Sequence, residues 1–487
     1  MAEEIIINVS PAETRVAVVS QGLLQEIFVE RVDARNTVGN IYKGRISRIL
    51  PGMQSAFIDI GSDKAAFAHI TDLVYSGAGG EESVVDQKID RLFSEGQTLA
   101  VQIAKEAIGA KGPRVTTHLS LASRCIVYLP GSRGVGISQK IESEEERKRL
   151  SDLVSPIIND EAGVILRTAA AGAASEEVLR DLRYLQEKWG NIQDDLAASG
   201  TPSLVYEDLP LYIKAIQDLI NEETHQIIVD HELTGILLRK FLDERIPGKR
   251  QILKVDPGKV LLFDEYQIED QIRAALNRQV PLKSGGYLVF DQTEAMTTID
   301  VNTGSFTGRK DLEETIYKTN LEAAAMIPRQ LRLRGIGGIV IIDFIDMLDE
   351  EHKRQVLRTL EKGQQFDRVN WRISDFSDIG LVEMTRKRSK ESLLRMMCEP
   401  CEACQGRGYV KTTQSVILEI FREIRRRSAN LQGSHIMIMA TERVIDHLKE
   451  IDCGYLERMS HELEFRFSLK SEASCMQEEF DIIIMNG

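Results

Sequence analysis

Two apolar runs near the middle of the chain are each followed by a carboxylate. Residues 295–299 lead into Asp300, and residues 339–342 lead into Asp343. The segment between them, residues 311–334, has the length and periodicity of a helix. The pattern predicts a strand–helix–strand crossover, which brings the carboxyl ends of two strands to the same sheet edge. Ligands of α/β sheets bind at that edge.

The two carboxylates suit a hard cation. Magnesium takes oxygen ligands and needs only one or two carboxylates, because water and phosphate complete its shell. Asn302 can add an amide contact to the ion or to a phosphate oxygen. A strand-end aspartate can also simply cap the next turn or helix. The occurrence of Asp300 and Asp343 together, each after an apolar run, favours metal binding.

The remaining patterns divide the chain into further domains. Three short apolar runs before residue 31 predict strands, and a second alternation of strand and helix patterns at 214–277 predicts the other part of the same domain. Residues 38–120 carry short strands separated by glycine turns. Residues 415–487 have the pattern of a small α/β domain.

Length and charge limit the possible functions. A chain of 487 residues is long enough for several domains. The formal net charge of −14 argues against nonspecific coating of nucleic acid but allows local basic surfaces, of which residues 329–334, 386–388 and 422–427 are candidates. Such charge runs are most often solvated helix faces. The acidic N-terminus lacks a signal-peptide pattern and no apolar run reaches 18 residues, so we expect a cytoplasmic protein without a membrane span.

Three of the six cysteines cluster at Cys398, Cys401 and Cys404. A C-x-x-C pair is half of a tetrahedral zinc site, and the sequence offers no second pair. A redox pair usually opens a helix, whereas this one lies in a linker that contains glycine and proline. Because one pair supplies two of the four ligands, the sequence favours a zinc ion whose other two ligands come from a second subunit. Cys398 is a further potential ligand. The scattered Cys125, Cys453 and Cys475 are expected to fill cores.

Four motifs carry a resemblance to a known family: Asp300-Val301-Asn302 and the segments 319–324, 329–334 and 341–347. They are similar to the catalytic region of the ribonuclease E/G family, and the resemblance runs from Glu3 to about Asp481. One departure is Pro328, inside the expected helix, where the family usually has a helix former.

The resemblance implies a multidomain α/β fold in which an OB-fold RNA-binding barrel and a 5′-sensor region are inserted into a ribonuclease-H-like domain. The expected parts are that ribonuclease-H-like domain at 1–36 and 214–277, the OB-fold at 37–120, the 5′-sensor region at 121–213, a DNase-I-like catalytic domain at 278–397, a zinc-link at 398–414, and a small dimerisation domain at 415–487.

The resemblance also implies residues that bind RNA. Phe57 and Phe67 fall on base-stacking positions and Lys111 on a phosphate-contacting one, although a phenylalanine in an apolar run is by default a core residue. Arg167 and Thr168 follow an apolar strand, so they can emerge at its end to bind a 5′-phosphate. The alternative for Arg167 is an ordinary surface salt bridge.

The implied activity is magnesium-dependent endonucleolytic cleavage of single-stranded RNA, with preference for 5′-monophosphorylated ends and with 5′-phosphate and 3′-hydroxyl products. Asp300, Asn302 and Asp343 are the expected catalytic residues, with Asp300 and Asp343 holding Mg²⁺. Cys401 and Cys404 are expected to hold Zn²⁺ between subunits of a homodimer or a dimer of dimers. The implied roles are 5′-end maturation of 16S ribosomal RNA and messenger RNA decay.

Two other function classes remain open from the sequence. One is a noncatalytic RNA-binding scaffold of the RNA-degradation machinery, which would not need Asp300, Asn302 or Asp343. The other is a magnesium phosphodiesterase that acts on DNA, against which the OB-type module and the 5′-sensor region argue. No histidine or lysine presents itself as a general base.

Overall fold

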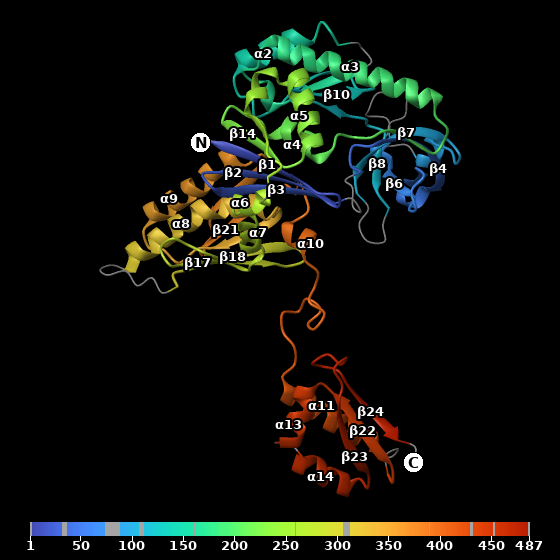
Figure 1. Ribbon diagram of the computed structural model, residues 1–487, viewed down its shortest axis with the longest axis vertical. Coiled ribbons are helices and arrows are strands. Elements are labelled where there is room, and N and C mark those ends of the chain that lie inside the picture. The colour runs from blue at the N-terminus through green and yellow to red at the C-terminus, as the bar shows by residue number, and fades with distance from the viewer. Residues whose placement is uncertain are drawn as a thin grey trace. The chain divides into compact units, whose positions relative to one another are not determined.

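The computed structural model describes residues 2–31, 37–73, 88–106, 112–158, 162–258, 260–304, 312–388, 390–428, 432–450 and 453–485. The chain forms two compact units, Met1–Ser392 and Leu393–Gly487, whose elements are labelled in Figure 1. Within the described ranges, no helix combines the length and apolarity needed to cross a membrane.

The first strands of the chain share a sheet with strands some two hundred residues later. The order is β15-β14-β1-β2-β3, and β1 runs parallel to β14. Ile5, Ile6 and Ile7 in β1 are fully buried, as expected for a strand covered on both faces. The elements are β1 (Glu3–Val9), β2 (Glu13–Ser20), β3 (Leu23–Arg31), α4 (Leu211–Leu219), β14 (Thr224–Val229), α5 (Glu232–Arg245), β15 (Leu253–Val255), α6 (Leu262–Glu265) and α7 (Ile268–Leu276).

A closed barrel of five strands follows β3 in the chain. The hydrogen-bonded order is β4-β5-β6-β8-β7, and the pairing of β4 with β7 closes it. The strands are β4 (Ile41–Leu50), β5 (Ser55–Asp59), β6 (Ala66–His69), β7 (Thr98–Lys105) and β8 (Arg114–Thr116), with the short helix α1 (Ile89–Leu92) before β7. This confirms an OB-like barrel in the region where glycine turns separate short strands.

A four-stranded sheet with two helices lies next in the chain. Its order is β11-β12-β10-β9. The elements are β9 (Leu121–Ala122), β10 (Ile126–Pro130), β11 (Gly134–Ile137), α2 (Glu144–Val154), β12 (Ala162–Leu166), η4 (Thr168–Ala170), α3 (Ser175–Ala198) and β13 (Ser203–Tyr206). The strand β13 pairs with β4 of the barrel, and Lys43 Nζ donates to the carbonyls of Leu196 and Ser199 at the end of α3. These contacts tie the barrel to the four-stranded sheet.

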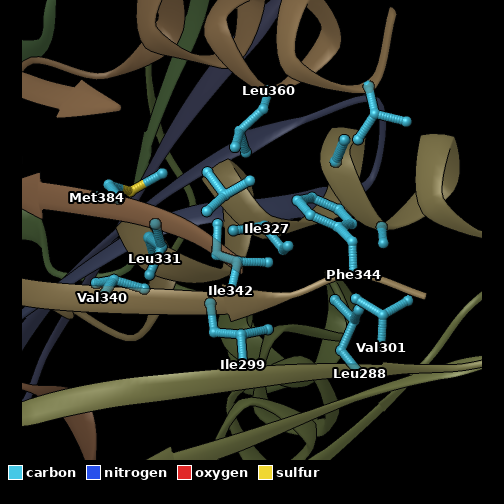
Figure 2. Close-up of a cluster of buried hydrophobic side chains, with 14 of the residues drawn as sticks. Leu288, Ile299, Val301, Ile327, Leu331, Val340, Ile342, Phe344, Leu360 and Met384 are labelled. Carbon is cyan, nitrogen blue, oxygen red and sulfur yellow. The ribbon is translucent and has the colours of Figure 1, made fainter. Parts of the chain in front are cut away.

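The six-stranded sheet β16-β17-β18-β19-β21-β20 contains the two carboxylates. Its elements are β16 (Gln279–Pro281), β17 (Tyr287–Gln292), β18 (Met296–Asn302), α8 (Leu312–Leu333), β19 (Gly338–Asp343), α9 (Glu350–Lys362), β20 (Trp371–Phe376) and β21 (Leu381–Arg386). Figure 2 shows Ile299 and Ile342 from the strands beside Ile327 from α8 and Leu360 from α9. These alternate apolar positions bury one face of the sheet, so the residues between them face the other way.

The basic run at 329–334 is buried rather than solvated. Arg329 Nε donates to the carbonyl of Leu24 in β3 at 3.1 Å, and the Arg332 guanidinium donates to the Gln25 side chain at 3.0 Å. The run therefore joins α8 to the N-terminal sheet. Arg386 is also internal, since it forms a two-pronged ion pair with Asp367 in which the side chains are only 4% and 3% exposed.

The second unit contains a three-stranded sheet in the order β23-β22-β24, and its core includes apolar residues of α11, α13 and α14. Its elements are α10 (Leu393–Met397), α11 (Thr413–Arg426), β22 (His435–Ala440), α13 (Glu442–Glu450), α14 (Cys453–Glu462), β23 (Arg466–Ser471) and β24 (Phe480–Met485). The buried side of α11 includes Val416, Ile420 and Ile424. Burial of this apolar side explains why the amphipathic segment forms a helix.

Candidate active site

The register of two strands places the predicted carboxylates side by side. The strands β18 and β19 pair in parallel, and Asp300 is directly opposite Asp343. Both side chains are exposed, and they lie on the sheet face away from α8. Asn302 Nδ2 donates to Asp300 Oδ2 at 2.8 Å, so the third predicted residue joins the pair. The strand–helix–strand crossover predicted from the sequence is confirmed.

Negative charge accumulates at this sheet edge. The pKa of Asp343 is raised from its ordinary value, first by partial burial and then by the charges of Asp300 and Asp346. The two neighbouring carboxylates therefore disfavour the ionised form of Asp343. A bound divalent ion would remove this repulsion.

Asn320 is a site residue that the sequence analysis did not single out. Its side chain is fully buried in α8, where Nδ2 donates to the carbonyl of Ile345 at 2.7 Å and Oδ1 accepts from the Ile345 N–H at 3.1 Å. The two bonds fix the backbone between Asp343 and Asp346. Asn320 lies within the family motif 319–324, but no role of its own was assigned to it from the sequence.

The turn between β20 and β21 forms one side of the acidic edge. The Gly380 N–H donates to the carbonyl of Ser377 at 2.9 Å, and the Leu381 N–H donates to Ser377 Oγ at 3.1 Å. Gly380 has φ +82°, and a Cβ there would lie 3.2 Å from Asp346 Oδ1. A glycine suits this position for two reasons: it adopts the left-handed backbone conformation without strain, and it has no Cβ to crowd the carboxylate.

The side chains at the acidic edge suit a magnesium ion with few protein ligands better than a metal enclosed by three or more protein ligands. In the described ranges, no group of three or more histidine, cysteine, aspartate or glutamate side chains is arranged to hold a metal. A magnesium ion uses one or two carboxylates together with water and phosphate, and the pair Asp300 and Asp343 matches that number. Asn302 adds an uncharged oxygen and amide N–H beside them.

The two phenylalanines lie on the outer surface of the barrel. Phe57 and Phe67 are cross-strand partners, and their rings meet edge to face with centroids 6.0 Å apart. Ala56 and Ile58, on either side of Phe57, point into the barrel core, to which neither phenylalanine belongs. The partly exposed aromatic pair is thus available for stacking. Lys111 lies outside the described residues.

Arg167 and Thr168 emerge at the end of β12, where Arg167 precedes the short helix η4. One Arg167 nitrogen donates to the carbonyl of Ser123 at 2.7 Å and to Asp218 Oδ1 at 2.6 Å. Thr168 Oγ1 lies 3.1 Å from Ser138 Oγ. The ion pair with Asp218 is the alternative foreseen for Arg167, and it leaves the other guanidinium nitrogens for a further acceptor.

A second arginine from a distant segment reaches the same place. Arg368 donates to the backbone carbonyl of Asp218 at 3.1 Å, and Lys140 Nζ donates to the carbonyl of Arg368 at 3.1 Å. Sequence reasoning missed both residues because they come from the β11–α2 connection and the segment before β20. Arg167 and Arg368 thus both contact Asp218, and Lys140 contacts the backbone of Arg368.

The C-x-x-C pair lies in a loop that favours a thiolate. The pKa of Cys404 is lowered by the backbone N–H groups of Gly408 and Gly406, with a smaller contribution from Cys401. Both glycines have positive φ, 80° and 82°, which turns these N–H groups toward the sulfur. Cys398 does not complete a group of three ligands with the pair in the described part of the chain.

The outward position of Phe57 yields a prediction about stability. Phe57→Ala is expected to lower the free energy of unfolding by less than about 1.5 kcal/mol, because the partly buried ring lies outside the core cluster of the barrel. Ile58→Ala, the neighbouring inward position, is expected to cost about 2–5 kcal/mol through cavity formation. Hydrogen exchange of the β4–β8 amides measures both. Equal losses of unfolding free energy in the two variants would show that Phe57 is a core residue.

The comparisons with known proteins agree over the whole chain. A model described as the ribonuclease E/G family matches residues 120–389, and one described as the thioredoxin-like domain of ribonuclease E/G matches residues 400–485. The chain is 44% identical to ribonuclease G of Escherichia coli K12 over 489 residues, which cover 100% of both chains. It is 43% identical to ribonuclease G of Haemophilus influenzae, with 99% of this chain and 100% of that protein covered. It is 35% identical to ribonuclease E of Escherichia coli K12 over 437 residues, which are 88% of this chain and 41% of that protein. The chain belongs to the ribonuclease E/G family.

Proposed function

We propose that this protein is a magnesium-dependent endoribonuclease that cleaves single-stranded RNA and leaves a 5′-phosphate and a 3′-hydroxyl. The observation that carries the proposal is the direct opposition of Asp300 and Asp343 on parallel strands. Membership of the ribonuclease E/G family and the similarity to proteins named ribonuclease G support an endoribonuclease. A noncatalytic scaffold would gain nothing from concentrating repelling carboxylates at an exposed edge.

The chain's own residues have three tasks in this reaction. Asp300 and Asp343 hold the magnesium ion, which supplies an activated water and stabilises charge on the phosphate when bound. Asn302 is oriented by its hydrogen bond to Asp300, and we assign its remaining amide N–H as a donor to a phosphate oxygen. Asn320 keeps the Ile345 backbone, and with it the end of β19, in place. We assign no general base.

The RNA-binding surfaces lie away from the carboxylates. We assign base stacking to Phe57 and Phe67, supported by their outward position on the barrel. We assign a phosphate contact to Lys111. Arg167 and Thr168 are assigned to a 5′-monophosphate, supported by their place at the strand end beside Arg368. A terminal phosphate would compete with Asp218 for the Arg167 guanidinium.

The finer fold and the assembly are also part of the proposal. We assign residues 1–36 and 214–277 to a ribonuclease-H-like domain and 278–397 to a DNase-I-like domain. Cys401 and Cys404 at the 398–414 linker share a zinc ion with a second subunit, which gives a homodimer or a dimer of dimers. The substrates are precursors of 16S ribosomal RNA and messenger RNAs, on which the enzyme acts in the cytoplasm.

The catalytic assignment predicts that Asp300→Asn and Asp343→Asn each abolish cleavage while leaving RNA binding nearly intact, because each removes a magnesium ligand. The measurement is cleavage of a labelled single-stranded RNA with and without magnesium, beside RNA binding by filter retention. Asp291→Asn, at a nearby exposed position of β17 paired with Arg278, is the matched control and is expected to retain activity. Substantial turnover by either site variant would overturn the assignment.

The 5′-end assignment predicts a selective defect. Arg167→Ala is expected to slow cleavage of 5′-monophosphorylated RNA by roughly tenfold to a hundredfold more than cleavage of the same RNA with a 5′-hydroxyl, since charge-assisted hydrogen bonds contribute roughly 1.5–3 kcal/mol. Arg273→Ala, which removes an exposed arginine paired with Asp270, is the control. Equal slowing of both substrates would show that Arg167 is structural.

The zinc assignment predicts about half a zinc ion per chain, because a pair of thiolates fills only half of a tetrahedral shell. Changing Cys401 and Cys404 to Ser is expected to release the zinc and weaken the dimer, as measured by metal analysis and by mass in solution. Cys475→Ser should change neither quantity. One full zinc ion per monomer would point instead to a site closed within one chain by Cys398.

A further inference from the structure

Two aliphatic side chains beside the carboxylates are unusually exposed. Leu348 is 87% exposed and Ile379 is 77% exposed, the two highest values for large hydrophobic side chains in the part of the chain that the structure describes. Both border Asp346. Leu348 follows it by two positions, and Ile379 precedes Gly380, whose backbone lies against the Asp346 carboxylate. We call Leu348 and Ile379 the apolar rim.

Folding does not account for the rim. The turn Ser377-Asp378-Ile379-Gly380 has turn-forming residues at its other three positions, and an exposed isoleucine gains nothing there from burial. Leu348 stands between the buried Met347 and Asp349, whose carboxylate caps α9 by accepting from the Glu351 N–H at 2.7 Å. Both backbones are therefore fixed by neighbours while the aliphatic side chains face solvent.

The charges around the rim limit what can contact it. Asp378 precedes Ile379 and is exposed, Gly380 approaches the Asp346 carboxylate, and Leu381 pairs with Asp343, so the neighbouring ionisable groups are acidic. A phosphate is repelled there unless a metal lies between. The uncharged part of a nucleotide is its base, whose faces make apolar contact and need no hydrogen bond.

We propose that Leu348 and Ile379 contact a nucleobase next to the scissile phosphate and so position the RNA strand over Asp300 and Asp343. This inference rests on the proposed endoribonuclease function. The occupant is a base of the substrate because the rim is continuous with the acidic edge: Leu381, two residues after Ile379, is the register partner of Asp343. An aliphatic surface reads no hydrogen-bonding edge, so the contact tolerates any base while requiring that one be present.

The test is a double comparison of protein and substrate. Cleavage is measured for wild type, Ile379→Ser and Leu348→Gln on a 5′-monophosphorylated RNA and on matched RNAs with one abasic nucleotide on either side of the cleavage site. Ile379→Leu tests rescue by shape. The control is Leu233→Gln, which removes an aliphatic side chain that is 66% exposed on helix α5.

We expect Ile379→Ser to slow cleavage of intact RNA by roughly threefold to tenfold, mainly through KM, because apolar contact with the base is lost. Ile379→Leu and Leu233→Gln should cleave like wild type. One abasic nucleotide in the RNA should slow cleavage by the wild type to a similar extent. On that abasic RNA, Ile379→Ser should cleave only slightly more slowly than the wild type does. This lack of additivity is what a purely structural effect of the substitution would not produce.

Three outcomes would overturn the inference. One is equal cleavage of intact and abasic RNA by the wild type. Another is fully additive losses from Ile379→Ser and the abasic nucleotide. The third is unchanged cleavage accompanied by a change of mass in solution, which would make the rim a contact between copies of the chain. Each of these outcomes requires a wild type that cleaves RNA, whereas failure of the endoribonuclease proposal itself would appear as no cleavage by the wild type.

Discussion

The parallel pairing of β18 with β19 is the constraint on which the candidate site depends. Register places Asp300 opposite Asp343, and no side-chain adjustment can move them far apart. The arrangement raises the pKa of Asp343 through burial and repulsion, a cost that the apolar core beneath the same strands offsets. Because Ile299 and Ile342 are buried on the opposite face, a slip of one residue would bury the carboxylates and expose the core.

The helix α8 holds this pairing and links it to the rest of the first unit. Its 22 residues connect the two parallel strands, and Asn320 within it bonds both backbone groups of Ile345. Its other side donates from Arg329 and Arg332 to β3. Burial lowers the pKa of both arginines, and that of Arg334 to about 10, which shows how far these charges are removed from water. The acidic edge is thereby fixed to the N-terminal sheet.

The same first unit carries features suited to different parts of an RNA strand. The acidic edge suits a metal and a phosphodiester, the aromatic pair Phe57 and Phe67 suits bases, and the arginines around Asp218 suit a terminal phosphate. The apolar rim adds an uncharged contact beside the acidic edge. A division of this kind separates phosphate contacts, which position the strand, from base contacts.

The sequence by itself determined the parts whose signals are local. Apolar runs ending in Asp300 and Asp343, with a helix between them, were sufficient to predict a crossover because strand and helix periodicities are properties of neighbouring residues. The glycine turns of residues 38–120 likewise predicted short strands there, and the family resemblance implied that they form an OB-fold barrel. The family motifs, read residue by residue, pointed to the same sheet edge.

Only the tertiary structure decided which residues from distant segments meet. The basic run at 329–334 has the composition of an exposed patch, yet it packs against β3 because that strand supplies acceptors some three hundred residues away. Arg368 joins Arg167 at Asp218, and Gly380 meets Asp346, through contacts that no sequence spacing encodes. Whether Phe57 faced the core or the solvent depended on the barrel register. Such facts follow from long-range packing, where burial and hydrogen-bond partners are set by the whole fold rather than by local pattern.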